Sequence, residues 1–143
     1  MDLSLMISDW ETLELQFAGA YNSLYIVRKD PQSDSSEEQK YIIDRLKADR
    51  QPIGIYILEK DFTNHSYQLQ KGDTIYAFSD GYVDQFGGDT GGKFNSVRFK
   101  NMLLAFQDKT MEEQKHILGR TFNKWKRDIA QVDDVLVMGI RIE

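Results

Sequence analysis

The sequence contains no cysteine, and this absence excludes several kinds of chemistry at once. A chain without thiols forms no disulfide, builds no thiolate zinc site and offers no cysteine nucleophile. The absence also fits a reducing compartment, and we expect a cytoplasmic protein.

Long apolar runs and concentrated basic charge are missing as well. The first ten residues, MDLSLMISDW, have neither the positive charge nor the apolar stretch of a signal peptide, and no segment reaches membrane-spanning length. The 18 Lys and Arg residues are scattered, apart from Lys124, Lys126 and Arg127, and the net charge is −5. We therefore expect no direct membrane insertion and no nucleic-acid partner.

What is present is the composition of an ordinary globular chain of 143 residues, which fits one domain. Leu3, Leu5 and Ile7 alternate with Ser4, Met6 and Ser8, as in a half-buried strand. Further strands are predicted at residues 13–18, 24–28, 67–70 and 74–79, and a short strand is favoured over a helix at 41–46. Residues 67–70 and 74–79 flank a Lys-Gly-Asp turn and predict a hairpin, whereas residues 30–38 predict a polar loop.

The second half predicts two helices and a closing strand. Ser96 can cap a helix that runs to about residue 108, and Thr110 with Glu113 forms a capping box for the next one. That second helix has one apolar stripe, formed by Leu118, Phe122, Trp125 and Ile129. Residues 135–142 alternate as a last strand. This order predicts an α+β fold with mainly antiparallel pairing and helices on one sheet face.

Two acidic sites stand out in this arrangement. Asp80 and Gly81 follow a predicted strand directly, and Asp133 and Asp134 precede the last one. Carboxylates at the ends of apolar strands place oxygen ligands at a sheet edge without burying unpaired charge, and Mg²⁺ and Mn²⁺ prefer such ligands. The alternative is that these are simple turn residues, because Asp and Gly both favour turns.

The order of short motifs along the chain favours the first interpretation. Residues 15–22 (LQFAGAYN) are similar to an alanine-glycine-histidine-asparagine strand end, and residues 52–54 (PIG) to a proline-leucine-glycine motif. Residues 71–74 (KGDT) and 79–81 (SDG) resemble a glycine-aspartate hairpin and a serine/threonine-aspartate-glycine motif, and residues 132–135 (VDDV) resemble a closing aspartate-aspartate motif. In this order and spacing, the whole chain resembles the second half of the metal-dependent (type 2C) protein phosphatases, in their bacterial sporulation-type (SpoIIE-like) branch.

This resemblance implies an antiparallel β-sandwich flanked by helices and a phosphoserine/phosphothreonine phosphatase activity. In the family, two Mn²⁺ or Mg²⁺ ions activate a water that attacks phosphorus directly and neutralise the phosphoryl oxygens. By resemblance, Asp80 and Asp133 are catalytic metal ligands, Gly81 and Asp134 support the site, and Asn22 lies nearby. The implied partner is a phosphorylated protein, for which an anti-sigma-factor antagonist is a candidate, in a bacterial signalling pathway.

The sequence departs from the family pattern at several positions. Tyr21 stands where the family has histidine, Ser23 where it has proline, and Leu136 where many members have threonine. The earlier aspartate-glycine motif, which supplies the carboxylate that bridges both metals, has no counterpart. We therefore expect residues 1–143 to be the C-terminal portion of a phosphatase domain, inactive or weakly active by themselves.

Other interpretations remain to be weighed against an enzyme. One is a non-catalytic phosphatase-like domain used for binding or regulation, and another is an inactive excised subdomain. An exposed sheet edge would also allow a homodimer. Residues 87–94 (GGDTGGKF) approach the phosphate-loop spacing, but Phe94 replaces the hydroxyl that would hold Mg²⁺. We expect an open loop there, either a flap beside the metal site or a plain surface loop.

Overall fold

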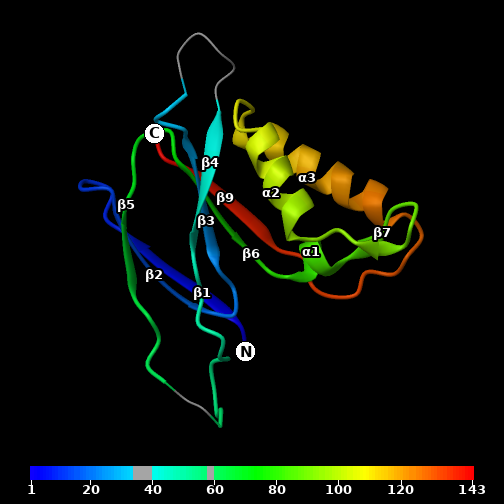
Figure 1. Cartoon of the computed structure of the whole chain (residues 1–143), viewed down its shortest axis with the longest axis horizontal. Coiled ribbons are helices and arrows are strands. Elements are labelled where there is room, and N and C mark those ends of the chain that lie inside the picture. The colour runs from blue at the N-terminus through cyan, green and yellow to red at the C-terminus, as the bar shows by residue number, and fades with distance from the viewer. Residues whose placement is uncertain (34–39, 58–59) are drawn as a thin grey trace.

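The computed structural model describes residues 1–33, 40–57 and 60–143 and consists of two packed antiparallel sheets with helices on one side (Figure 1). The first sheet has the strand order β1-β2-β5, with bounds Leu3–Ser8, Glu14–Ala20 and His65–Gln68. The second has the order β4-β3-β6-β9, with bounds Tyr41–Leu46, Leu24–Lys29, Thr74–Phe78 and Val137–Arg141. The predicted α+β architecture, a β-sandwich flanked by helices, is confirmed.

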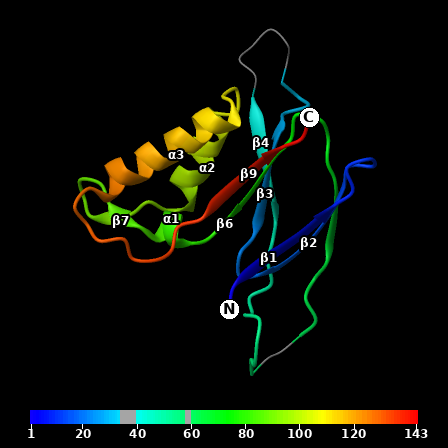
Figure 2. The same cartoon turned by 180° about the vertical axis from the view of Figure 1, so that it is seen from behind.

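The helices follow β6 and cover the outer face of the second sheet, as the view from behind also shows (Figure 2). The short helix α1 spans Gly81–Asp84, and α2 and α3 span Ser96–Ala105 and Met111–Lys126. Between α1 and α2, β7 (Phe86–Gly87) and β8 (Gly92–Lys93) form a small two-stranded ribbon. Among the described residues, no helix combines the length and apolar character needed to cross a membrane.

Strand β3 sits at the centre because both of its faces are apolar. Leu24 and Ile26 pack against Leu15 and Phe17 of the first sheet, so they form the core between the two sheets. Tyr25 and Val27, which point to the opposite face, pack instead under the helices with residues such as Phe99. All four β3 residues are at most 3% exposed, which is the burial expected of a strand covered on both faces.

Strand β1 forms as predicted, but its exposed face is the apolar one. Leu3, Leu5 and Ile7 are 38%, 53% and 65% exposed, whereas the alternate residues of the strand are half-buried. A period of two residues defines two faces, and it does not say which of them meets the neighbouring sheet when both contain apolar side chains.

The predicted hairpin between β5 and β6 is wrong. The two strands belong to different sheets, because β5 pairs with β2 and β6 pairs with β3 and β9. The turn that joins them, where Asp73 N donates to Gln70 O at 3.1 Å, carries the chain from one sheet to the other. Gly72 has a φ of 92° in this turn, a conformation that favours glycine.

Helices α2 and α3 form where the sequence predicted them, but both end earlier, at Ala105 and Lys126, and one cap differs. Thr110 and Glu113 form the predicted capping box of α3. The cap of α2 is Asn95 rather than Ser96, because the Asn95 side chain accepts from the backbone N–H groups of Val97 and Arg98. Asn95 tolerates the positive φ of 70° found at this position better than most residues do.

The predicted open loop at residues 87–92 is the β7–β8 ribbon, packed against the end of α3. Gly88 N donates to Trp125 O at 2.9 Å, and a Cβ atom on Gly87 would lie 2.0 Å from the same oxygen. The glycines are therefore needed for close packing. Trp125 itself is half-buried as part of the predicted apolar stripe, although Ile129 lies beyond the helix and is exposed. Most of the predicted polar loop at residues 30–38 lies outside the described residues.

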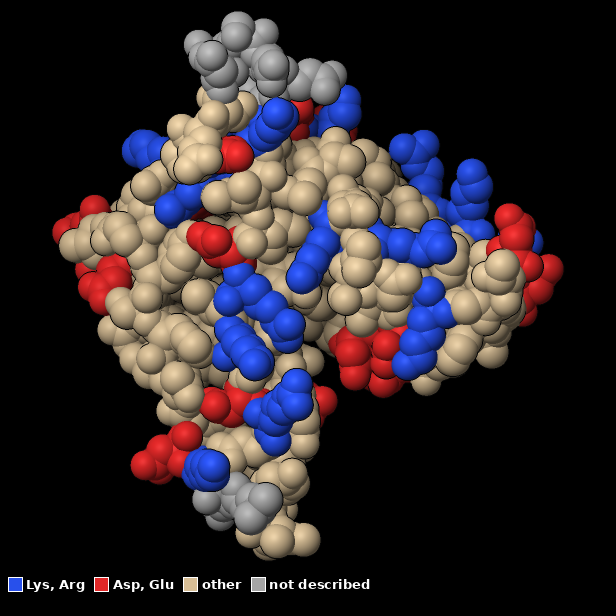
Figure 3. Space-filling model, viewed as in Figure 1, with Lys and Arg blue, Asp and Glu red and all other residues tan. Residues whose placement is uncertain are grey.

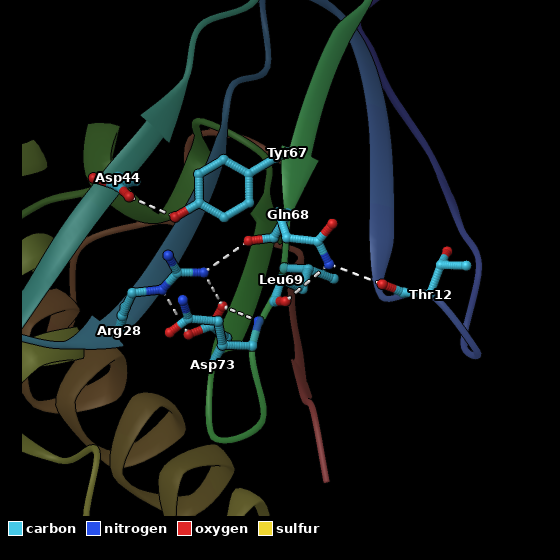
Figure 4. A network of polar contacts seen from close by, with 8 residues as sticks. Thr12, Arg28, Asp44, Tyr67, Gln68, Leu69 and Asp73 are labelled. Carbon is cyan, nitrogen blue, oxygen red and sulfur yellow. Dashed lines mark hydrogen bonds and ion pairs between the residues drawn. The ribbon is translucent and has the colours of Figure 1, made fainter.

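A buried ion pair joins the turn before β6 to strand β3 (Figure 4). The guanidinium of Arg28 donates from Nε to Asp73 Oδ1 at 3.0 Å and from Nη2 to Asp73 Oδ2 at 2.6 Å. Arg28 Nη2 also donates to the backbone oxygen of Gln68 at 2.9 Å, and Gln70 N donates to Asp73 Oδ2 at 2.8 Å. Acidic and basic side chains otherwise lie interspersed over the surface shown in Figure 3.

We expect Asp73→Asn to lower the free energy of unfolding by about 3 kcal/mol, because it leaves the Arg28 charge without its partner. The Asp73 side chain is only 2% exposed, so water cannot replace the lost carboxylate. Urea unfolding followed by circular dichroism measures the change. Asp89→Asn is the matched control, because it breaks an exposed ion pair with Arg127 and should cost less than about 1 kcal/mol. Equal losses in the two variants would contradict the role assigned to Asp73.

Candidate metal centre

Asp80 lies at the end of a buried strand, where the backbone leaves the sheet. Thr74–Phe78 of β6 is buried along most of its length, and Asp80 follows it as an exposed residue that precedes α1. The Asp80 side chain makes no capping hydrogen bond to α1. Its carboxylate is therefore not used to cap the helix, and Asp80 lines a small surface cavity.

The segment that contains Asp133 is held against the end of β6 by pairing with β9. Phe78 of β6 pairs with Val137 of β9, and Ser79 N donates to Leu136 O at 3.0 Å. The Ser79 hydroxyl extends this contact beyond the strands, because Oγ donates to Asp134 O at 2.8 Å and accepts from Leu136 N at 2.9 Å. A single serine thus fixes the two acidic segments side by side.

The electrostatics of Asp80 reflect this proximity. The pKa of Asp80 is raised above its ordinary value, first by burial and then by the negative charge of Asp133, with smaller contributions from Asp84 and Asp2. The structure places the backbone segments that carry Asp80 and Asp133 side by side, because Ser79 and Gly81 both contact Asp134.

The supporting residues are distributed around the same edge. Gly81 packs against the backbone of Asp134, because a Cβ atom on Gly81 would lie 2.4 Å from the Asp134 carbonyl oxygen. The Asp134 N–H donates to Asp133 Oδ1 at 2.7 Å, which holds the Asp133 carboxylate in one orientation. Asn22 lines a cavity of about 200 Å³ together with Asp80, so it lies near the acidic edge from the side of β3.

Sequence reasoning missed several neighbours of the site. Asp2 and Arg45 approach the acidic edge although no local pattern pointed to them, and Ser79 was noted only as part of the SDG motif, without its bridging role. Arg45 reaches the cavity only because β4 pairs with β3 in a register that places it opposite Tyr25. Such neighbours depend on tertiary pairing, which a single sequence does not contain.

The donor set fits a hard divalent cation in part. Two carboxylates on one edge supply the oxygen ligands that Mn²⁺ and Mg²⁺ prefer, and their mutual repulsion would be relieved by a cation. Within residues 1–33, 40–57 and 60–143, no cluster of three or more Asp, Glu, His or Cys side chains is arranged to hold a metal ion. Asp80 and Asp133 would therefore provide part of a coordination shell.

Comparisons with known proteins point to one family. The model of the family described as stage II sporulation protein E (SpoIIE) matches residues 3–143. The SiaA-PP2C domain of Pseudomonas aeruginosa superposes with a TM-score of 0.82 at 31% sequence identity, over 99% of this chain and 52% of that chain. No curated protein sequence matches.

Solved structures of SpoIIE from Bacillus subtilis have the same fold. Its PP2C phosphatase domain with a fragment of the regulatory domain gives a TM-score of 0.70 at 23% identity, over 99% of this chain and 37% of that chain. Its phosphatase domain presoaked with Mn gives 0.68 at 22% identity, over 100% of this chain and 56% of that chain. The chain thus spans about half the length of the phosphatase domains it matches.

We expect Gly81→Ala to lower the free energy of unfolding by about 2 kcal/mol, because the new methyl group would overlap the Asp134 backbone. Gly119→Ala is the matched control, since a Cβ atom on Gly119 in α3 meets nothing within 4 Å. That control should gain up to about 1 kcal/mol from helix propensity. Urea unfolding of both variants measures the difference, and a stabilised Gly81→Ala protein would contradict the close contact.

We expect Asp133→Asn to lower the pKa of Asp80 in the metal-free chain, because it removes a repelling charge. The raised pKa means that the folded chain holds the Asp80 proton more tightly than the unfolded chain. Ionised Asp80 therefore opposes folding at neutral pH, and this effect disappears as the pH falls through the raised pKa. Carboxyl-carbon NMR shifts followed against pH measure the change. Asp89→Asn is the control. Asp89 does not contribute to the raised pKa of Asp80, so this change should leave the titration of Asp80 unaltered.

Proposed function

Because the chain belongs to the stage II sporulation protein E family and has the fold of its PP2C-type phosphatase domains, we propose that it is the metal-binding C-terminal portion of a protein serine/threonine phosphatase. The observation that supports this proposal is that the segments containing Asp80 and Asp133 lie side by side at one sheet edge, where Ser79 Oγ donates to Asp134 O at 2.8 Å. An edge with two carboxylates suits the hydrolysis of a phosphomonoester, because this reaction requires stabilisation of negative charge more than a covalent nucleophile.

We assign different roles at the site to different residues of the chain. Asp80 and Asp133 would bind a divalent cation through carboxylate oxygens, and Asp134 orients Asp133 through its backbone N–H. Ser79 and the small Gly81 keep the two segments at a fixed separation. When bound, Mn²⁺ or Mg²⁺ supplies the acidity that activates a water and neutralises phosphoryl charge.

The substrate we propose is a phosphorylated protein of a bacterial cytoplasmic signalling pathway, such as an anti-sigma-factor antagonist. A phosphoserine or phosphothreonine side chain extends from a protein surface and can reach an open edge such as that of Asp80, which is exposed. A phosphatase-like domain used only for binding is the second candidate. It is favoured by the lack of a third acidic ligand among the described residues.

We expect Asp80→Asn and Asp133→Asn each to weaken Mn²⁺ binding about 10-fold or more, because even an outer-shell partner of a metal ligand contributes this much. Isothermal titration with Mn²⁺ measures the affinity, and Asp89→Asn serves as a control with the same change of charge.

Turnover of p-nitrophenyl phosphate separates the two candidates. Residues 1–143 should hydrolyse it slowly, and an N-terminal extension that contributes an aspartate-glycine motif should accelerate it in the presence of Mn²⁺. The gain should disappear in Asp80→Asn. An extended protein that binds Mn²⁺ without hydrolysis would favour the binding role.

A further inference from the structure

Arg45 of β4 lines the same cavity as Asp80, although Asp80 follows β6, a strand that does not pair with β4. The cavity has a volume of about 200 Å³ and is also lined by residues that include Tyr21, Tyr25 and Ser96. Arg45 stands opposite Tyr25 in the β3–β4 register, so its position at the cavity is set by main-chain pairing. One positive and one negative side chain therefore share this small space.

The Arg45 side chain is oriented by a buried hydroxyl. Ser23, which is 6% exposed, accepts a hydrogen bond from Arg45 Nη2 at 3.0 Å. The same Ser23 oxygen accepts from the backbone N–H of Ala48 at 3.1 Å, which fixes the hydroxyl itself. The family pattern has proline where this chain has Ser23, and proline offers no hydroxyl. The departure at Ser23 thus gives Arg45 a partner that the motif lacks.

The positive charge of Arg45 is not neutralised by the protein. Within the described part of the chain, no Asp or Glu oxygen lies within 4.0 Å of its guanidinium nitrogens, and its hydrogen bond to Ser23 is to a neutral group. Arg28 and Arg127, by contrast, each pair with a carboxylate. A guanidinium that is held in place and left unpaired beside a cavity retains donors for an incoming anion.

We propose that Arg45, oriented by Ser23, binds the phosphoryl group of a phosphoserine side chain in this cavity. The guanidinium presents planar N–H donors that match two phosphoryl oxygens, while Asp80 lines the same cavity. Arg45 is then a substrate-binding residue, and Ser23 is a positioning residue that acts through it. This inference rests on the proposed phosphatase function, because it assigns the phosphoryl group of that substrate to the Asp80 cavity.

Binding of O-phosphoserine to the full chain in the presence of EDTA tests the proposal without any metal. We expect Arg45→Gln to weaken binding about tenfold, as for loss of a charge-assisted pair, measured by NMR titration of backbone amide shifts. Ser23→Ala should weaken it about threefold, because the charge remains but is no longer held. Arg50→Gln is the matched control. Arg50, like Arg45, is an exposed arginine, but it lines a different cavity with Thr63 and His65, so its loss should leave the affinity unchanged.

The double variant Ser23→Ala/Arg45→Gln distinguishes positioning from general damage to the fold. If Ser23 acts through Arg45, the double variant binds O-phosphoserine no more weakly than Arg45→Gln alone. Urea unfolding of each variant checks that the chain remains folded. Wild-type affinity in Arg45→Gln, or an additive loss in the double variant, would overturn the assignment.

Asp80→Asn separates this proposal from the phosphatase proposal. In EDTA it should bind O-phosphoserine at least as tightly as the wild type, because it removes a negative charge from the cavity. In Mn²⁺ it should lose the hydrolysis of p-nitrophenyl phosphate by the extended protein. Retained hydrolysis would count against the phosphatase proposal alone, whereas retained binding in Arg45→Gln would count against the role of Arg45 alone.

Discussion

The ion pair between Arg28 and Asp73 is the constraint on which the rest of the structure depends. It connects the central strand β3 to the turn at which the chain passes from the first sheet to the second. A buried pair of this kind stabilises only when its geometry is complete, and here both carboxylate oxygens and the neighbouring backbone groups of Gln68 and Gln70 are engaged. Because β6 begins at Thr74, directly after Asp73, the pair anchors the start of the strand that leads to Asp80.

From that point the acidic edge is assembled by backbone contacts rather than by the acids themselves. Pairing of β6 with β9 and the hydroxyl of Ser79 hold the segment of Asp133 beside that of Asp80. In this arrangement the pKa of Asp80 is raised, first by desolvation and then by the negative charge of Asp133. Functional sites commonly contain locally unfavourable interactions, for which the packing of the surrounding structure compensates.

Sequence patterns predicted what depends on local chemistry. The strands, the capping box of Thr110 and Glu113, and the acids at strand ends follow from periodicity and residue type, and the order of short motifs indicated the family. Features that depend on which strands pair in the tertiary structure could not be predicted in the same way. The pattern around Gly72 is that of a hairpin turn, yet its two flanking strands belong to separate sheets. Likewise, Arg45 and Ser23 meet only through the register of β3 and β4.

The place of β9 in the second sheet has a consequence for the order of events during translation. Asp80 and the helices leave the ribosome before β9 does, so a nascent chain has one half of the acidic edge long before the other. The contact between β6 and β9 spans most of the second half of the sequence and closes a large loop, which makes it intrinsically slow to form. The acidic edge is therefore assembled only after synthesis has passed Asp133 and β9 has paired with β6.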